Sequence, residues 1–311
     1  MFTWAIPAGE FVNSFVRVLG NMPNLKKKVA FFTVVYPGVE PYLNDFFHSL
    51  ATQTNPHFDL IIGNDGLSSL DLVKYRPDIS IIDLQGTPAE VRDAGFQFLR
   101  SEGYKYVVFG DSDDFFSPTR IETSLDLLQT YDVVVNDLDL VAADGRLIQP
   151  GYLSQRLNQK VEIENEFIYD KNIFGLSNTA VRTSWLPSNR IPADLLAVDW
   201  FVFANILERG ARAVFTTSTR TFYRQHGANI AGLGDWTLES ILRGVWVKAL
   251  HYKAMTTVDL EGYDAIAAKF AMLNLRLLED EIFKNEYIDF LKSKTKDFPC
   301  WWENVLLPEE Y

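Results

Sequence analysis

Cysteine is almost absent from this chain, which has one, Cys300, among 311 residues. A single cysteine excludes an internal disulfide framework and fits a reducing compartment. Basic residues are also in the minority, because 29 lysines and arginines face 41 aspartates and glutamates, a formal net charge of −12. Binding to nucleic acid needs clustered lysine and arginine to neutralise phosphates, so we expect no nucleic-acid partner.

Long apolar runs are missing as well. No stretch of about 18 apolar residues occurs, so we expect no transmembrane helix. The apolar start of the chain is broken by polar residues and has no basic segment before it, which is unlike a signal peptide. We expect residues 1–28 to be an N-terminal extension, with residues 1–21 of little importance to the fold. We also expect a cytoplasmic protein, with peripheral contact at the inner face of the membrane left open.

The chain is 47% hydrophobic, which suits one large or two small globular domains. Within residues 29–136, strand patterns alternate with helix patterns. Runs of β-branched and aromatic residues predict strands at 29–35, 58–63, 79–82, 105–109 and 132–136. Amphipathic segments between them predict helices at 40–53, 88–100 and 118–129. Thr87 and Glu90 form a capping box for the second helix, and Ser117 is the expected N-cap of the third. This alternation indicates an α/β fold, a mostly parallel sheet flanked by helices.

The alternation stops after residue 136. Asp144-Gly145 is a hairpin signal, and the later patterns predict a helix at 194–208 and strands at 213–216 and 220–223. From Trp236 onward the pattern is helical, with an interruption near 256–262. We therefore expect an α/β domain over 29–233 and a helical C-terminal region over 234–311.

The most informative segment is an acidic turn, Asp111-Ser112-Asp113-Asp114, directly after the strand that ends at Phe109. In open α/β sheets, ligands bind at the carboxyl ends of the strands. Two like charges at ~4 Å repel by about 4 kcal/mol at an effective dielectric near 20. Such a cluster is tolerated when it is well solvated, protonated, or neutralised by a divalent cation, and hard oxygen ligands favour Mg²⁺, Mn²⁺ or Ca²⁺.

Four short motifs, in their order along the chain, resemble those of the family 2 glycosyltransferases of the GT-A fold. The resemblance covers about residues 29–230. The motifs are Tyr36-Pro37 after the first strand, Gly63-Asn64-Asp65-Gly66 after the second, the acidic turn, and Val198-Asp199-Trp200 followed by Tyr223-Arg224-Gln225-His226-Gly227-Ala228-Asn229. The resemblance implies transfer of a hexose or N-acetylhexosamine from a nucleoside diphosphate sugar, most simply UDP-linked, to an acceptor hydroxyl with inversion. It also implies a role in surface polysaccharide or glycoconjugate assembly.

The resemblance further implies which residues hold the donor. Asp65 would accept a hydrogen bond from the nucleobase, a contact that a carboxylate can make with an imide N–H. Arg92 would lie near the base or the diphosphate, although Asp93 stands where the family usually has Asn. Tyr36, Asp111 and Ser112 would also contact the donor. The alternative for Asp65 is a turn-stabilising role, and the alternative for Arg92 is a surface salt bridge.

For the metal and the diphosphate, the resemblance implies a second set of residues. Asp113 would ligate Mn²⁺ or Mg²⁺ between the donor phosphates, and Asp111 would contact the ribose or share the metal through water. His226 would be a third metal ligand or a phosphate donor, and Arg224 would pair with phosphate oxygens. Asp114 would cap or orient the helix that follows.

Asp199 matches the position of the general base in inverting members, where a carboxylate takes the proton of the attacking hydroxyl. The family usually has Glu-Asp here and this chain has Val198-Asp199, so a helix-face aspartate paired with an arginine is the alternative. Trp200 could stack on an acceptor sugar, but its apolar helix favours a place in the core.

Other classes fit the acidic turn less well. A dehalogenase-type phosphatase needs its acidic motif after the first strand, a nucleotidyltransferase needs a basic glycine-rich loop there, and a Rossmann dehydrogenase needs GxGxxG there. A catalytically inactive sugar-nucleotide-binding or scaffold protein on the same fold stays open. The acceptor would be a glycan or a lipid-linked sugar. Acceptor recognition, homodimer formation and membrane-surface contact are alternatives for the C-terminal aromatic residues Trp246, Tyr252, Trp301 and Trp302.

Overall fold

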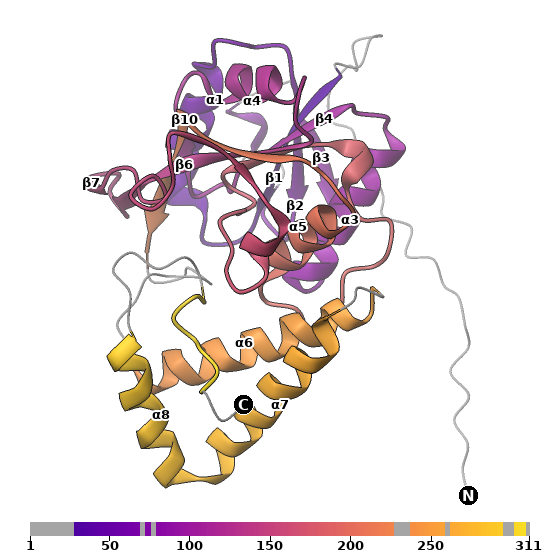
Figure 1. The fold of residues 1–311 in the computed structure, drawn as a ribbon. Helices are drawn as coiled ribbons and strands as arrows, with labels where there is room; N and C mark the ends of the chain where they lie inside the picture. The colour runs from indigo at the N-terminus through magenta and orange to yellow at the C-terminus, as the bar shows by residue number, and fades with distance from the viewer. Residues whose placement is uncertain are drawn as a thin grey trace, which may run out of the picture.

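A computed structural model describes residues 28–68, 72–75, 79–226, 237–258, 262–294 and 302–308. Outside these ranges lie the expected N-terminal extension up to residue 27, residues 227–229 of the last motif, Cys300 and Trp301. Over the described residues the chain folds into one ten-stranded sheet with helices on both faces, followed by three helices, as Figure 1 shows. The predicted α/β class with flanking helices and a helical C-terminal region is confirmed.

Parallel βα units build the first half of the sheet. Its strands are β1 (Val29–Val35), β2 (Asp59–Asn64), β3 (Ser80–Asp83) and β4 (Tyr106–Phe109), in the order β3-β2-β1-β4. The helices of this half are η1 (Glu40–Tyr42), α1 (Leu43–Ala51) and α3 (Pro88–Ser101). The capping box of Thr87 and Glu90 is present at the start of α3, as predicted. All four carboxyl ends therefore meet at one edge of the sheet.

The second half of the sheet is mixed. It contains β5 (Phe115–Phe116), β6 (Val133–Ala142), β7 (Leu147–Gln149), β8 (Lys160–Ile163), β9 (Thr179–Arg182) and β10 (Ala213–Gln225). Strand β9 lies antiparallel between β4 and β6, while β10 runs parallel to β6. The parallel arrangement expected for most of the sheet is thus confined to β3-β2-β1-β4 and the β6–β10 pair. The Asp144-Gly145 turn joins the antiparallel β6 and β7, as its hairpin signal predicts.

Several element boundaries differ from the sequence-based prediction, and strand β6, predicted to end at residue 136, runs on to Ala142. Strand β10 is continuous where two strands are predicted, with a register irregularity between Thr216 and Arg220. Helix α4 (Arg120–Leu127) begins later than expected, and Ser117 does not cap it. Because β5 pairs with β10, the Ser117 hydroxyl instead accepts from the backbone N–H of Arg220 at 2.9 Å. Helix α5 (Val198–Glu208) starts four residues after the predicted position.

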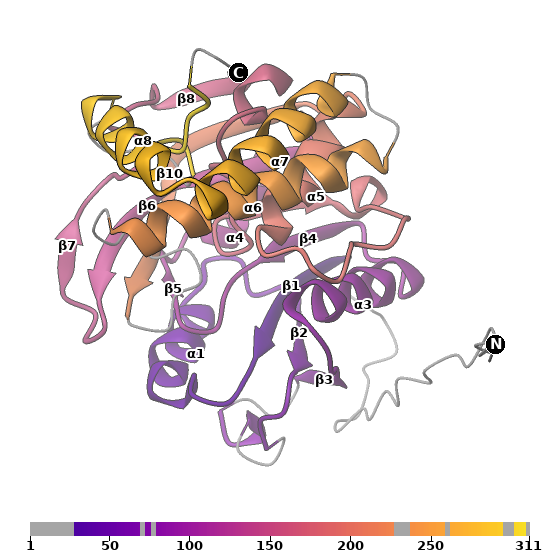
Figure 2. The same cartoon turned by 90° about the horizontal axis from the view of Figure 1, so that it is seen from below.

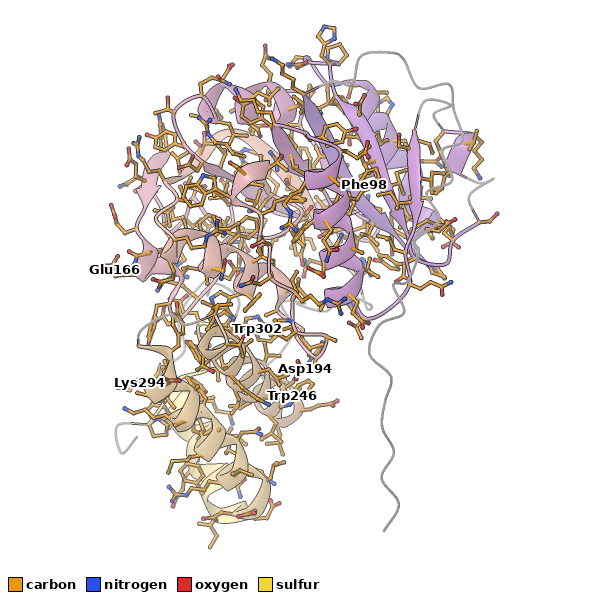
Figure 3. All side chains as sticks on the ribbon, turned by 90° about the vertical axis from the view of Figure 1, so that its right-hand side faces the viewer. Phe98, Glu166, Asp194, Trp246, Lys294 and Trp302 are labelled. Atoms are coloured by element: carbon orange, nitrogen blue, oxygen red, sulfur yellow. The ribbon has the colours of Figure 1, made fainter. Side chains whose placement is uncertain are left out.

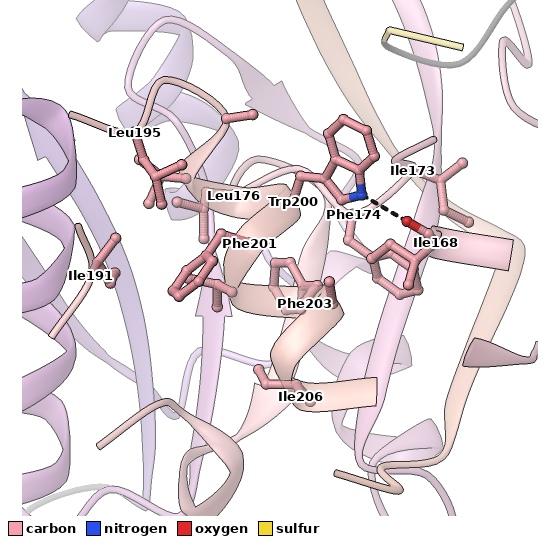
Figure 4. Close-up of a cluster of buried hydrophobic side chains, with 14 of the residues drawn as sticks. Ile168, Ile173, Phe174, Leu176, Ile191, Leu195, Trp200, Phe201, Phe203 and Ile206 are labelled. Atoms are coloured by element: carbon pink, nitrogen blue, oxygen red, sulfur yellow. Dashed lines mark hydrogen bonds between the residues drawn. The ribbon is translucent and has the colours of Figure 1, made fainter. Parts of the chain in front are cut away.

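Two apolar cores lie on opposite faces of the sheet, because successive side chains of a strand alternate between its faces. Phe31 and Val35 of β1 join the core under α1 and α4, whereas Phe32 and Val34 join the core that contains α3 and α5. In Figure 1, α1 and α4 lie above the sheet and α3 and α5 below it. Helix α5 is buried almost all round, and Trp200 lies in its core with the indole N–H donating to the Ile168 carbonyl at 2.7 Å (Figure 4). Trp200 is thus a core residue, as its apolar helix predicted.

The C-terminal helices α6 (Leu238–Thr256), α7 (Tyr263–Glu279) and α8 (Glu281–Lys294) extend the core on the α5 side. Figure 2 shows them together over α5 and β10. The short 3-10 helices η2 (Asn165–Ile168) and η3 (Thr183–Trp185) complete the described elements. Among the helices that the structure describes, none combines the length and the apolar character needed to cross a membrane.

Candidate active site

A pocket of about 410 Å³ opens at the carboxyl edge of the parallel strands. Six of the predicted site residues line it: Tyr36, Asp65, Arg92, Asp111, Asp113 and Asp199. They come from the turns after β1, β2 and β4, from the second turn of α3 and from the first turn of α5. The fold therefore brings together side chains from residues 36 to 199 of the chain, at the edge where the sequence places a ligand.

Asp65 reaches the pocket from the turn after β2. Its backbone N–H donates to the Val35 carbonyl at 2.8 Å, which fixes the turn against the end of β1. The neighbouring Asn64 is buried and stabilises the same turn, since its side chain accepts from Leu67 N–H and donates to Asp83. Turn stabilisation is thus carried by Asn64, which leaves the Asp65 carboxylate to line the pocket.

The two outer carboxylates of the acidic turn have separate partners. Asp111 accepts from the Arg92 guanidinium at 2.8 Å. Asp113 lies 2.9 Å from Nε2 of His226 and accepts from the Tyr36 hydroxyl at 3.3 Å. Arg92 therefore bridges α3 and the acidic turn inside the pocket, and its salt bridge is a contact of the site rather than of the outer surface. Asp93 turns to Gln97, which donates to it at 2.7 Å.

Ser112 and Asp114, the inner members of the turn, point into the protein. The Ser112 hydroxyl donates to the Val34 carbonyl at 2.7 Å and its side chain is fully buried. The Asp114 carboxylate accepts from the Ser177 hydroxyl and, at 2.7 Å, from the backbone N–H of Arg224. Two expectations are therefore corrected: Ser112 does not face the pocket, and Asp114 links the turn to β10 instead of capping α4. The alternation follows from the turn's shape, which directs successive side chains to opposite sides.

Arg224 is likewise buried, although the sequence suggested a contact with donor phosphates. Its guanidinium donates to the carbonyls of Asp113 and Ala143 and to the Asp45 carboxylate, at 2.6 to 2.8 Å. The guanidinium also lies over the Tyr42 ring, 4.8 Å from the ring centre. The expected donor contact is corrected to a structural role, because these partners tie the acidic turn to α1 and to the β6–β7 turn.

His226 completes the arrangement around Asp113. Its ring stacks on Tyr42, with ring centres 5.0 Å apart and an interplanar angle of 27°, which orients Nε2 toward the carboxylate. Within the described residues no three histidine, cysteine, aspartate or glutamate side chains are already gathered around a common metal position. Asp113 and His226 nevertheless offer adjacent oxygen and imidazole ligands, so a cation held here would take its other ligands from a bound phosphate and water.

Charge repulsion in the acidic turn supports a cation-binding role. Burial raises the pKa of Asp114 well above its usual range, and the charges of Asp113 and Asp111 raise it further. Burial also raises the pKa of Asp111, against the opposing effect of the Arg92 guanidinium. Burial and the charge of Asp113 raise the pKa of the Tyr36 phenol, so this group stays a hydrogen-bond donor. A divalent cation beside these oxygens would relieve the repulsion, and the residues fit such a group.

Asp199 lies in the first turn of α5, where one carboxylate oxygen accepts from the Trp200 N–H at 2.8 Å. Burial raises its pKa to about 6, with a smaller contribution from the charge of Asp111. A carboxylate with a pKa of about 6 is ionised at neutral pH yet basic enough to take a proton from a hydroxyl. Arg92 is close enough to lower this pKa, but among the described residues no arginine or lysine forms a salt bridge with Asp199, so the alternative of a paired helix-face aspartate finds no support there.

Further residues line the pocket beyond Asp199, and the sequence did not indicate most of them. Asn172 and Leu176 come from the irregular segment before β9, Leu196 from the loop before α5, and Tyr223 from β10. The last is Trp302, from the C-terminal tail. Of these, Tyr223 stood at the start of the last family motif and Trp302 was one of several aromatic residues near the C-terminus, while the others carried no sequence signal.

The chain matches the family model described as glycosyl transferase family 2 over residues 31–186. It is 30% identical over 124 residues to the uncharacterized glycosyltransferase YwdF of Bacillus subtilis (strain 168), across 38% of this chain. The match spans 45% of the length of that relative.

Two solved structures are similar in fold. The first is S. aureus TarS 1–349 in complex with UDP-GlcNAc, with a TM-score of 0.58 and 20% identity over 86% of this chain and 81% of that one. The second is the mannosyltransferase PcManGT from Pyrobaculum calidifontis in complex with GDP-Man and Mn²⁺, with a TM-score of 0.55 and 12% identity over 91% and 79%. At these identities the likeness establishes the GT-A glycosyltransferase fold.

Proposed function

Because this chain belongs to glycosyl transferase family 2, we propose that it moves a hexose or N-acetylhexosamine from a UDP-linked donor to an acceptor hydroxyl with inversion. The acceptor is a glycan or a lipid-linked sugar in surface polysaccharide or glycoconjugate assembly. The observation that carries the proposal is the shared pocket, in which Asp65, Asp113 and Asp199 stand on three different elements. These are the groups that recognition of a base, binding of a diphosphate and activation of a hydroxyl require.

The donor is held by the strand-end residues. The Asp65 carboxylate faces the pocket from the turn after β2 and accepts from the imide N–H of the nucleobase. Arg92, oriented by its 2.8 Å contact with Asp111, lies beside the diphosphate and offers its remaining N–H groups to phosphate oxygens. The Tyr36 hydroxyl donates to Asp113 and keeps that carboxylate aimed into the pocket.

Asp113 and His226 would hold a Mn²⁺ or Mg²⁺ ion, with Asp111 sharing it through water. When bound, the cation supplies Lewis-acid stabilisation of the charge on the leaving nucleoside diphosphate. The TarS and PcManGT structures contain UDP-GlcNAc and GDP-Man with Mn²⁺, respectively, which supports a donor and an ion of this kind.

Asp199 is the general base. Its carboxylate takes the proton of the acceptor hydroxyl while that oxygen attacks the anomeric carbon from the face opposite the leaving diphosphate. The pKa of about 6 suits this role at neutral pH. The charges of Asp111 and Arg92 act on the pKa of Asp199, which supports a general base close to the diphosphate end, as a direct displacement requires.

A thermal-shift titration with UDP, GDP, CDP and dTDP, each with Mn²⁺, Mg²⁺ or EDTA, tests the donor site. A ligand at 100 times its Kd stabilises the native state by about 2.7 kcal/mol. We expect a shift with UDP that disappears in EDTA and in the Asp113→Ala variant, where donor binding weakens at least about 10-fold. No shift with any nucleotide would favour the inactive scaffold, and an unaffected Asp113→Ala variant would remove this residue from the metal site.

A further inference from the structure

Among the described residues of the C-terminal tail, Trp302 alone lines the active-site pocket, together with Asp199 of α5 and Tyr223 of β10. The described tail, residues 302–308, returns from the helical region to the α/β domain. Figure 3 shows Trp302 at the junction of the two, where the indole packs partly buried against the α5-side core. Among the described residues the indole N–H has no hydrogen-bond partner, so it is available to a ligand.

Three contacts hold the tail in this position. Glu303 is buried and forms a two-armed ion pair with Arg156, whose second nitrogen lies 2.7 Å from the carboxylate. The Lys248 ammonium of α6 donates to the Val305 carbonyl at 2.8 Å. The Tyr287 hydroxyl of α8 donates to the Leu306 carbonyl at 2.7 Å. These contacts join the tail to both the α/β domain and the C-terminal helices, so the position of Trp302 is determined by both.

The backbone at Trp302 is also constrained. Its φ is 62°, a left-handed value that no other non-glycine residue has in the part of the chain that the structure describes. Residues with side chains adopt this conformation rarely, and it persists where the surroundings impose it. The constraint comes from close packing of the tail on α6, three residues after Trp302. A Cβ atom on Gly244 of α6 would lie only 2.6 Å from the Val305 side chain.

The residues that line the pocket include two chemically different groups. Asp65, Arg92, Asp111 and Asp113, which we call the nucleotide end, are charged, whereas Leu176, Leu196 and Trp302, which belong to what we call the acceptor end, are apolar. A pyranose ring has hydroxyls around its edge and an apolar C–H face. Such a ring fits an aromatic face that carries one free N–H donor, with a carboxylate base beside it to receive a hydroxyl proton.

We propose that Trp302 is the stacking platform for the pyranose ring of the acceptor sugar and sets the acceptor hydroxyl against Asp199. This inference rests on the proposed function, because it assigns the acceptor side of the same pocket. Among the described residues of the tail, none belongs to the nucleotide end, so we expect donor binding to be independent of Trp302.

The test compares Trp302→Ala, Trp302→Phe and, as a matched control, Trp246→Ala, which removes an exposed tryptophan of α6 outside the pocket. Methyl glycosides of glucose, galactose, mannose and N-acetylglucosamine serve as probes in the presence of UDP and Mn²⁺. Saturation-transfer difference NMR reports which protons touch the protein, and thermal shift with UDP reports donor binding for each variant.

In the wild type we expect transfer to the protons of one C–H face of at least one glycoside. Trp302→Ala should weaken that glycoside about 30-fold, as truncation of a central tryptophan does in interfaces, with the UDP shift unchanged. Trp302→Phe should retain most of the binding and Trp246→Ala all of it. If UDP binds but no glycoside does, or if Trp302→Ala binds as the wild type does, the inference is wrong while the donor site stands. If UDP does not bind the wild type, the proposed function fails first.

Discussion

The two ends of the pocket are built in different ways. At the nucleotide end, Tyr36 and Asp65 each follow a strand directly and Asp113 lies in the turn after β4, so their positions depend on local turns. At the acceptor end, Leu176, Tyr223 and Trp302 come from an irregular segment, a long strand and the tail. Their proximity depends on packing between parts of the chain far apart in sequence. The groups that act on the donor can therefore be positioned by local structure, while the residues proposed to select the acceptor depend on the whole fold.

We expect the strongest loss of activity from a change at Asp199, the proposed base, which lines the same pocket as both groups of residues. Asp199→Asn keeps the shape of the side chain and removes its basicity, so kcat should fall by roughly 10²–10⁴. Donor binding, which belongs to the other end, should survive, as measured by the UDP thermal shift. Steady-state kinetics of sugar transfer check the first part. An unchanged kcat would show that another group is the base.

The next largest change is expected from Arg224. This residue supports the acidic turn of the nucleotide end from a distant part of the chain, so even that end does not depend on local structure alone. Arg224 holds the acidic turn from β10 through the carbonyls of Asp113 and Ala143. Arg224→Met leaves these buried acceptors without their charged donor, so the free energy of unfolding should fall by about 3 kcal/mol. Asp45→Asn removes only the half-exposed partner of Arg224 and should cost less than about 1 kcal/mol.

Urea denaturation followed by circular dichroism measures both variants. Arg224→Met should also weaken UDP binding, because the Asp113 carboxylate loses its fixed position. If Asp45→Asn were as destabilising as Arg224→Met, the ion pair rather than the carbonyl contacts would hold the turn.

Much of the nucleotide end could be predicted from the sequence, for a physical reason. Runs such as Val29–Val35 determine buried strands, and the residues that follow a parallel strand must lie at the ligand-binding edge. This places Asp65, Asp111 and Asp113 without knowledge of the tertiary fold. The motif around Arg224 was equally visible, but a motif does not say which side of the strand faces solvent. Packing against Tyr42 and Asp45 decides that.

The rest could not be read from local patterns. Ser117 and Pro118 form a good helix start in the sequence. In the structure, the pairing of β5 with β10 brings the Ser117 hydroxyl to the backbone N–H of Arg220, from which it accepts a hydrogen bond. That pairing joins residues about a hundred positions apart, so no local pattern reports it. Trp302 is a similar case, because its place depends on α6, α8 and Arg156 together. Sequence alone shows only an aromatic residue near the C-terminus.

The pH dependence of transfer sharpens the assignment of Asp199. Burial raises its pKa from the ordinary 3.8 to about 6, so the carboxylate is ionised above pH 6 and protonated below it. At saturating donor, kcat/KM for the acceptor should be constant above pH 6 and fall about tenfold per pH unit below it. A rate that stays constant down to pH 5 would contradict the base assignment.

The same pKa affects the stability of the fold in the opposite direction. Because the carboxyl of Asp199 has a higher pKa in the folded state than in the unfolded state, its contribution to the free energy of unfolding is fully present at low pH. This contribution is lost as the pH rises from about 4 to 6.

The smallest effect tests whether the acceptor end depends on the tail. Glu303→Gln keeps the size of the side chain but removes the charge that pairs with Arg156 and replaces one of the two acceptor oxygens by an amide NH2 group. Because Lys248 and Tyr287 still hold Val305 and Leu306, we expect the tail to stay attached with Trp302 less well fixed. The acceptor KM should rise by a few-fold, with kcat at saturating acceptor and the UDP thermal shift unchanged. Trp246→Ala, on the same side of the molecule, is the control. A rise in the donor KM of equal size would mean that the tail supports the whole pocket, and the contrast between its two ends would then not hold.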